Sequence, residues 1–367
     1  MTSGAETAGF MAMKGSGYYS KVTVSAREAI DSATPWVLEA VDRLPLDDDG
    51  RPVRVADLGC ADGGTSIGLW HRVLRALRQR VPGRAIEIVY TDLPRNDFSQ
   101  LFRMLHGQTE IESYYGQIPD VYPFASATSF HQAIFPPASV HLAFSAHANH
   151  YISKVPCPIA EHVHMVGATE AERAAYEETG RLEWERLLAL RARELVPGGR
   201  LCMMSFGTDD DGRQLGSTGG VPVFDTFNTL WRQLADEGVI SHEEYLRTNF
   251  PQVLRTTEQF TAPLHDETSE AWAAGLRLEN IEWRIHECPF ARSFEDHRDP
   301  ERFAREYVPT LRSWSEPTFA NGLADRSPDD RLAVLDEFYG RYGQLVAKDP
   351  EGHGMDLLDS LITCVKA

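Results

Sequence analysis

The segment RPVRVADLGCADGGTS, residues 51–66, joins a short strand pattern to a glycine-rich turn. Residues 53–58 carry the strand pattern, and apolar side chains then recur at helical spacing from Ile67 to Leu77. A second strand pattern, IEIVYTDLP, follows at 86–94. The order strand, turn, helix, strand is typical of a parallel α/β sheet, and a strand that stops at such a turn commonly stops at a ligand.

The rest of the chain continues this alternation and predicts a doubly wound α/β sheet with a helical cap. Strands are expected at 139–148, 200–206, 276–287 and the C-terminal DLLDSLITCVKA, and helices at 168–195, near 224–246, 256–275 and 329–347. We divide the chain into a ligand-binding core at 1–206, a mostly helical cap at 207–275 and a return to the core sheet at 276–367. The segment 157–168 follows the third strand, which is a suitable place for a lid.

Charge and cysteine content narrow the partners and the compartment. The net charge is -18 and there is no basic block, which argues against nucleic acid or an anionic membrane as the main partner. Five cysteines without a CxxC pair indicate a reducing compartment and no structural zinc. The N-terminus lacks the features of a secretory signal, and no apolar run is long enough to span a membrane, so we expect a cytoplasmic protein.

Three ligand classes compete for the glycine turn. A dinucleotide fingerprint fits poorly, because Gly59 and Gly63 have the spacing G-x-x-x-G, and a P-loop needs a lysine that is absent before Thr65. A nucleoside without a pyrophosphate, such as S-adenosylmethionine, fits better. Asp57 would then bind its charged amino-acid end, and Asp92, after the next strand, would hold the ribose hydroxyls.

The chain contains five motifs in the order in which they occur in the SABATH family of S-adenosylmethionine-dependent methyltransferases. It resembles a bacterial-type member of that family with a divergent acceptor site. The five motifs are MKGSGYYS at 13–20, VADLGCADGGTS at 55–66, VYTDLPRNDFSQLFRML at 89–105, FPPASVHLAFSAHANHYISKVP at 135–156 and LRARELVPGGRL at 190–201. The resemblance implies a Rossmann-like class I methyltransferase fold with a helical cap, and a homodimer or higher homo-oligomer. Together with the turn, it predicts these cofactor-binding residues: Tyr19, Asp57, Gly59, Cys60, Thr65, Asp92, Leu93, Ser129, Phe130 and Ser145.

The acceptor side departs from the family pattern. Members that methylate aromatic carboxylic acids hold the carboxylate with a glutamine and a tryptophan, whose positions here correspond to Ala26 and Tyr151. His150 is kept, and His147 stands where the family often has tyrosine. Loss of the glutamine removes a hydrogen bond to a charged group, worth about 1.5–3 kcal/mol. A simple planar acid is therefore less favoured as the acceptor.

The missing glutamine favours C-methylation of the alkene of a prenyl diphosphate, such as geranyl diphosphate. That reaction needs a base, for which we name Glu170 and then Glu161, and cations such as Arg27 and Arg247, with Mg²⁺ as a further candidate cofactor, to hold the diphosphate. Trp231 is expected to form part of an apolar wall. The alternatives are carboxyl O-methylation of a small aromatic or terpenoid acid, which needs no base, and a non-catalytic cofactor-binding protein.

Overall fold

A computed structural model describes residues 20, 22–47 and 50–367. Within them, one sheet of eight strands has the order β3-β2-β1-β4-β5-β8-β7, with β6 paired to β5 outside this path. The strands are β1 (Val53–Leu58), β2 (Ile86–Thr91), β3 (Val121–Ser126), β4 (Val140–Ala146), β5 (Leu195–Thr208), β6 (Arg255–Thr256), β7 (Leu276–His286) and β8 (Leu357–Lys366). Neighbouring strands pair in parallel from β3 to β5, whereas β8 is antiparallel to both β5 and β7. The predicted α/β fold is thus confirmed.

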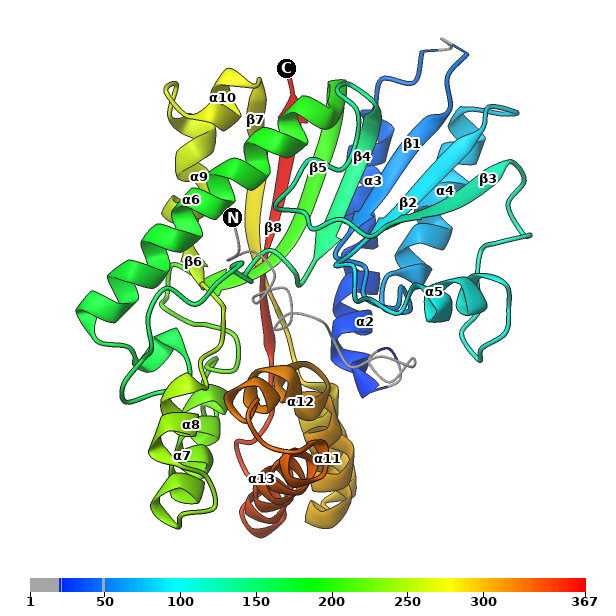
Figure 1. Ribbon diagram of the computed structural model, residues 1–367. Helices are drawn as coiled ribbons and strands as arrows, with labels where there is room; N and C mark the ends of the chain where they lie inside the picture. Colours follow the sequence, from blue (N-terminus) through cyan, green and yellow to red (C-terminus); the bar gives the residue numbers. More distant parts are fainter. Residues whose placement is uncertain (1–19, 21, 48–49) are drawn as a thin grey trace.

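Helices cover both faces of the sheet. On β1, Val53 and Val55 belong to one buried cluster, whereas Ala56 and Leu58 belong to another, because successive side chains of a strand point to opposite faces. The first face is covered by α2 (Val24–Ser32), α3 (Thr34–Asp42) and α4 (Ile67–Arg80), and the second by α6 (Glu170–Glu194), α9 (Thr257–His265) and α10 (Glu270–Ala273). Figure 1 shows α6 crossing in front of the sheet, with α3 and α4 behind it.

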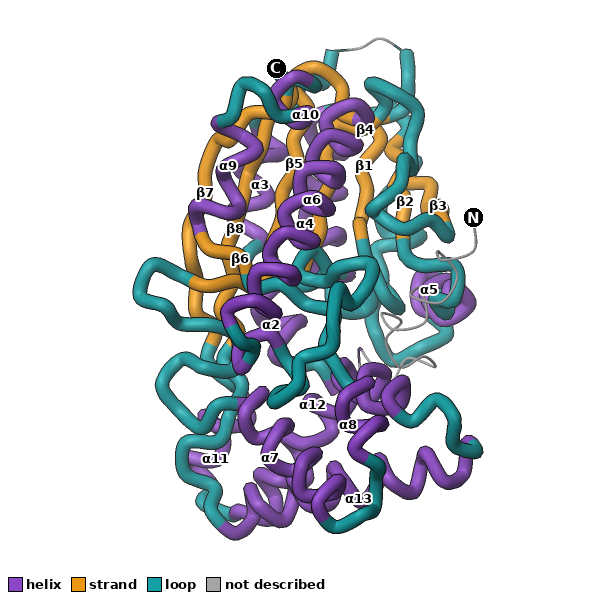
Figure 2. The backbone as a smooth tube through the Cα atoms, turned by 60° about the vertical axis from the view of Figure 1, so that its left-hand side comes forward, coloured by secondary structure: helices purple, strands orange, loops and turns teal. Residues whose placement is uncertain are grey.

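The helical cap is built from two separate stretches of chain. Its helices are α7 (Val223–Asp236), α8 (His242–Arg247), α11 (Pro289–His297), α12 (Pro300–Gly322) and α13 (Pro328–Lys348), and they gather at one end of the sheet in Figures 1 and 2. Our predicted cap at 207–275 differs from this arrangement: it includes α9 and α10, which pack on the sheet, and it omits α11 to α13. Two shorter elements, α5 (Phe98–Leu105) and a 3-10 turn at Met165–Gly167, complete the described structure. Of the described helices, none has the length and apolar character needed to cross a membrane.

Candidate active site

The turn after β1 requires glycine at two positions. Gly59 has φ +78° and Gly63 has φ +77°, in the left-handed region where a Cβ is unfavourable. A Cβ on Gly59 would lie 2.7 Å from the Cβ of Ala148, and one on Gly63 would lie 2.5 Å from the Cδ1 of Leu101. The turn therefore has no room for a side chain at these two positions, and the backbone of Gly59 also lines a cavity.

This cavity, which we call the strand-end cavity, lies where β1, β2 and β4 end. Its lining residues are Ile30, Gly59, Ala61, Thr65, Asp92, Leu93, Asn96, Ser129, Phe130, Ala146, His147, Ala148 and Tyr151. Six residues predicted to bind the cofactor are thereby brought together: Gly59, Thr65, Asp92, Leu93, Ser129 and Phe130.

Asp92 is the carboxylate of the strand-end cavity. Its Oδ2 accepts a hydrogen bond from the backbone N–H of Ala61 at 2.7 Å, and its Oδ1 accepts one from the N–H of Leu93 at 2.7 Å. Burial raises the pKa of Asp92, and these two backbone donors oppose that shift. A carboxylate has about four acceptor positions, so two remain for hydroxyl groups of a ligand. This arrangement fits the ribose of S-adenosylmethionine.

Three of the predicted cofactor residues lie outside the lining of the strand-end cavity. Asp57 is buried behind the glycine turn, where it accepts hydrogen bonds from Ser66 Oγ at 2.6 Å and Trp70 Nε1 at 2.7 Å. Ser145 is buried and donates to the carbonyl of Leu58 at 2.7 Å, and Cys60 is also buried. Asp57 and Ser145 thus brace the turn, which corrects our expectation that they face the ligand. Tyr19 lies outside the described residues.

We expect Asp57→Asn to alter how stability depends on pH. Burial raises the pKa of Asp57 from 3.8 to about 6, so above pH 6 the folded protein contains a buried charge that the unfolded chain would solvate. The charged carboxylate then costs at most about 3 kcal/mol at neutral pH, and this cost disappears as pH falls below the unfolded value. Chemical unfolding between about pH 4 and 7 should show the Asn variant gaining stability relative to wild type as pH rises. A constant difference between the two proteins would contradict this.

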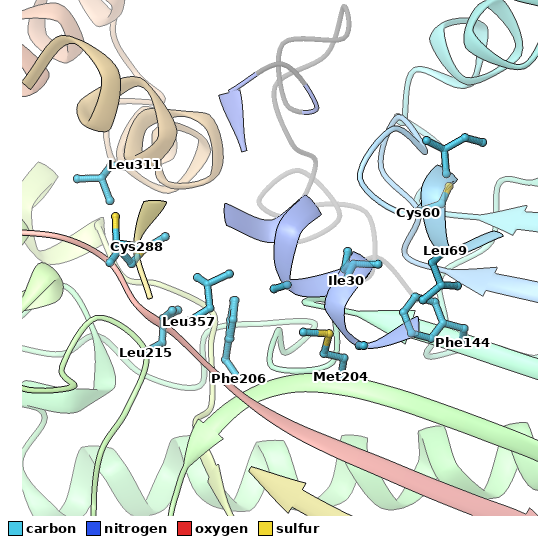
Figure 3. Packing of buried hydrophobic residues seen from close by; sticks show 14 of the residues in the cluster. Ile30, Cys60, Leu69, Phe144, Met204, Phe206, Leu215, Cys288, Leu311 and Leu357 are labelled. Carbon is cyan, nitrogen blue, oxygen red and sulfur yellow. The ribbon is translucent and has the colours of Figure 1, made fainter. Parts of the chain in front are cut away.

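A second cavity adjoins the first, and we call it the cap cavity. Its lining is mostly apolar: Thr23, Ser25, Ala26, His147, His150, Tyr151, Phe206, Leu215, Gln252, Thr310, Trp314, Met355 and Leu357. Figure 3 shows Phe206, Leu215 and Leu357 close together in the buried cluster. His147 and Tyr151 line both cavities. Four residues predicted to bind the acceptor, Ala26, His147, His150 and Tyr151, are therefore brought together.

His147 is held at the junction of the two cavities. It has φ +54°, its ring stacks on Phe206 at a centroid distance of 4.5 Å, and its Nε2 lies 3.0 Å from Oδ1 of Asp359. Asp359 is fully buried on β8, and His286 Nε2 lies 4.0 Å from its other oxygen. Burial lowers the pKa of the neighbouring His150 well below its usual value, so that ring is neutral at physiological pH. The junction thus contains two imidazoles, one of them backed by a buried carboxylate.

The proposed base residues lie away from both cavities. Glu170 is exposed in the first turn of α6, beside the capping box formed by Thr169 and Glu172. Glu161 is exposed and pairs with Arg232 at 2.7 Å. Because a general base must reach the proton that it removes, these positions do not support our prediction of a catalytic Glu170 or Glu161.

The predicted cations and the aromatic wall are also elsewhere. Arg27 donates to the carbonyl of Ser20 at a separate surface cavity, and Arg247 forms an ion pair with Asp325. Trp231 is fully buried in the cap, and its ring centroid lies 4.8 Å from that of Phe319. The aromatic residues that recur at helical spacing here belong to the hydrophobic core of the cap. No three His, Cys, Asp or Glu side chains of the described residues form a metal-binding group, so Mg²⁺ gains no support.

Several lining residues were missed by sequence reasoning. Asn96, in the DLPRNDF motif, donates to the carbonyl of Ala61 at 2.6 Å and was within reach of a motif argument. Gln252 and Trp314 come from distant segments that carry no local signal for the site. The same holds for Asp359, which contacts His147 without lining either cavity. Trp314 supplies the aromatic wall that we assigned to Trp231.

Comparison with known proteins places the chain among methyltransferases. Residues 7–361 match the family described as SAM dependent carboxyl methyltransferase. Gibberellic acid methyltransferase 2 of Arabidopsis thaliana is 28% identical over 346 residues, covering 88% of this chain and 84% of that protein. Loganic acid O-methyltransferase of Catharanthus roseus is 26% identical over 255 residues, covering 64% and 66%. The bacterial type that we expected gains no support, because these relatives are plant proteins.

The fold has a counterpart among solved structures. A structure of loganic acid methyltransferase with SAH superimposes with a TM-score of 0.75 at 21% identity, covering 97% of this chain and 99% of that chain. This similarity extends over the sheet and the cap, and it agrees with the fold expected from the sequence.

Proposed function

The chain belongs to the SAM dependent carboxyl methyltransferase family and is an S-adenosylmethionine-dependent methyltransferase; from this premise we propose that it methylates the carboxylate of a small, largely apolar acid. The observation that carries the proposal is that the strand-end cavity and the cap cavity share two side chains, His147 and Tyr151. A cofactor in the first and an acid in the second would meet there. Carboxyl O-methylation thereby replaces C-methylation of a prenyl diphosphate, the reaction that the sequence favours.

The residues present are suited to positioning two substrates. S-adenosylmethionine supplies an electrophilic methyl group when bound. Asp92 provides carboxylate oxygens in the strand-end cavity, and Phe130 provides an aromatic surface on which the adenine ring of the cofactor can stack. Around the junction, Tyr151 and His147 offer polar atoms to an acceptor carboxylate. An ionised carboxylate is already a nucleophile, so holding it in line with the methyl group is sufficient, and no base is required.

The cap cavity favours an apolar acceptor. Phe206, Trp314 and Leu357 line it, whereas Arg27 and Arg247, the cations that we assigned to a diphosphate, do not. Removing a carboxylate from water inside such a cavity strengthens each hydrogen bond that it accepts. The acids in the names of the relatives, gibberellic and loganic acid, are therefore suitable first acceptors to test, with phenylacetic acid as a simple aromatic acid. The predicted homo-oligomer and the cytoplasmic location remain predictions.

We expect Glu170→Gln to leave the kcat/KM for the acid unchanged, because this exposed side chain does not reach the cap cavity. The assay compares wild type and variant with each of the three acids, and with geranyl diphosphate in the presence and absence of Mg²⁺. Asp329→Asn, a change at the first turn of α13, serves as a matched surface control. Turnover of the diphosphate that is lost in Glu170→Gln would refute O-methylation as the main activity.

A further inference from the structure

Tyr151 is fixed against Gln252 by the backbone. The two residues form an isolated antiparallel bridge. On either side of it, the N–H of Ile152 donates to the carbonyl of Pro251 at 2.9 Å, and the N–H of Val253 donates to the carbonyl of His150 at 2.8 Å. The relative position of the two side chains is therefore set by main-chain hydrogen bonds.

The tautomer of His164 follows from its contacts. The backbone N–H of Val166 donates to Nδ1 at 3.2 Å, so this nitrogen carries no proton. The ring is fully buried, which lowers its pKa to about 3 and keeps it neutral. Nε2 must then carry the proton, and it donates to Oε1 of Gln252 at 3.2 Å. Stacking on Phe224, with centroids 3.7 Å apart, holds the ring in this orientation.

The orientation of Gln252 follows from that of His164. Because the amide oxygen accepts from His164, the amide nitrogen points away from that ring, and Tyr151 lies directly opposite Gln252 in the antiparallel bridge. Gln252 opposes the rise in the pKa of Tyr151 as a hydrogen-bond partner of its hydroxyl. An amide nitrogen only donates, so the phenol oxygen accepts this bond. Burial raises the pKa of Tyr151 to about 12, so the hydroxyl keeps its proton. That single proton remains available for a partner in the cavities that Tyr151 lines.

We propose that His164 and Gln252 are positioning residues that fix the hydroxyl of Tyr151 as a donor to the acceptor carboxylate; the inference rests on the proposed function. The chain of donors runs from Val166 N–H through His164 and Gln252 to Tyr151. A carboxylate only accepts hydrogen bonds, so a fixed donor favours it over a group that can only donate, such as an ammonium group. This contact compensates for Ala26, which lines the cap cavity without a polar group.

The test is a double-mutant cycle of Tyr151→Phe and Gln252→Met, in which the KM for the acid is measured. The acid used is whichever of phenylacetic, gibberellic and loganic acid the wild-type protein methylates fastest. Tyr151→Phe removes a hydrogen bond to a charged group and should raise this KM about 10- to 100-fold. Gln252→Met should raise it several-fold in the Tyr151 protein and add nothing in the Phe variant. Gln233→Met, an exposed change on α7, is the matched control.

Gln252 does not line the strand-end cavity, so Gln252→Met should leave the affinity for S-adenosylhomocysteine unchanged, which separates loss of the proposed contact from damage to the fold. Multiplying effects of the two substitutions, or an unchanged KM in Tyr151→Phe, would overturn this inference while leaving O-methylation in place. If Gln252→Met fails to fold, His164→Asn replaces it in the cycle, because it removes the donor to Gln252 Oε1 and should likewise add nothing in the Phe variant. No ester from any of the three acids with wild type would overturn both the inference and the proposed function.

Discussion

Asp92→Asn should weaken binding of S-adenosylhomocysteine about 100-fold, from the loss of two charge-assisted hydrogen bonds worth roughly 3 kcal/mol together. In the wild-type protein both carboxylate oxygens accept backbone N–H groups and retain capacity toward the strand-end cavity. The amide of Asn places a donor against the N–H of Ala61 or of Leu93. Isothermal titration calorimetry measures the affinity.

The control for Asp92→Asn is the same substitution at Asp97. Asp97 caps α5 by accepting from the N–H of Gln100 at 3.1 Å, and it does not line the strand-end cavity. Asparagine is an equally good N-cap residue, so Asp97→Asn should keep wild-type affinity. Equal affinities for wild type and Asp92→Asn would show that Asp92 is not the ribose-binding group.

Arg191→Met should lower the free energy of unfolding by about 3–5 kcal/mol, because it leaves a buried carboxylate without its cation. Arg191 and Glu194 of α6 are both buried, and Nε of Arg191 lies 2.8 Å from Oε2 of Glu194. Arg191 also donates to the carbonyls of Phe130 and Gln132 at 2.9 and 2.7 Å. The substitution should therefore also weaken cofactor binding, since Phe130 lines the strand-end cavity.

Urea unfolding gives the stability change, with Arg193→Met as the control on the same helix. Arg193 forms an ion pair with Glu270 in which both side chains are more than half exposed. Such surface pairs are worth about 0–1 kcal/mol. If both variants lost the same small amount of stability, the buried pair would not have the structural role that we assign to it.

The parallel core could be predicted because its signals are local. The strand at 53–58, the glycine turn and the helix that follows are contiguous, and the structure has β1 at Val53–Leu58 and α4 at Ile67–Arg80. Strand β3 was missed, since it contains Pro123 and exposes Tyr122 and Phe124, which hides the usual alternation. Helix α12 was missed because Pro309 and Pro317 lie inside it and resemble helix breaks.

The two halves of the site differed in how far the sequence could describe them. Cofactor residues such as Gly59 and Asp92 lie at strand ends within recognisable motifs, so their convergence follows from the parallel sheet. The cap cavity combines Ala26, Gln252 and Trp314, which only tertiary packing brings together. The sequence suggests Glu170 as a base because it lies on the helix that follows the segment 157–168, but the capping box at the start of α6 accounts for acidic residues there.

The most direct test of carboxyl O-methylation is to locate the transferred methyl group in the product. Wild-type protein is incubated with methyl-labelled S-adenosylmethionine and the acids, and the product is treated with alkali. The account predicts that the label is in a methyl ester and is released as methanol. Label that stays on carbon after alkali, or label found only in a product of geranyl diphosphate, would contradict it.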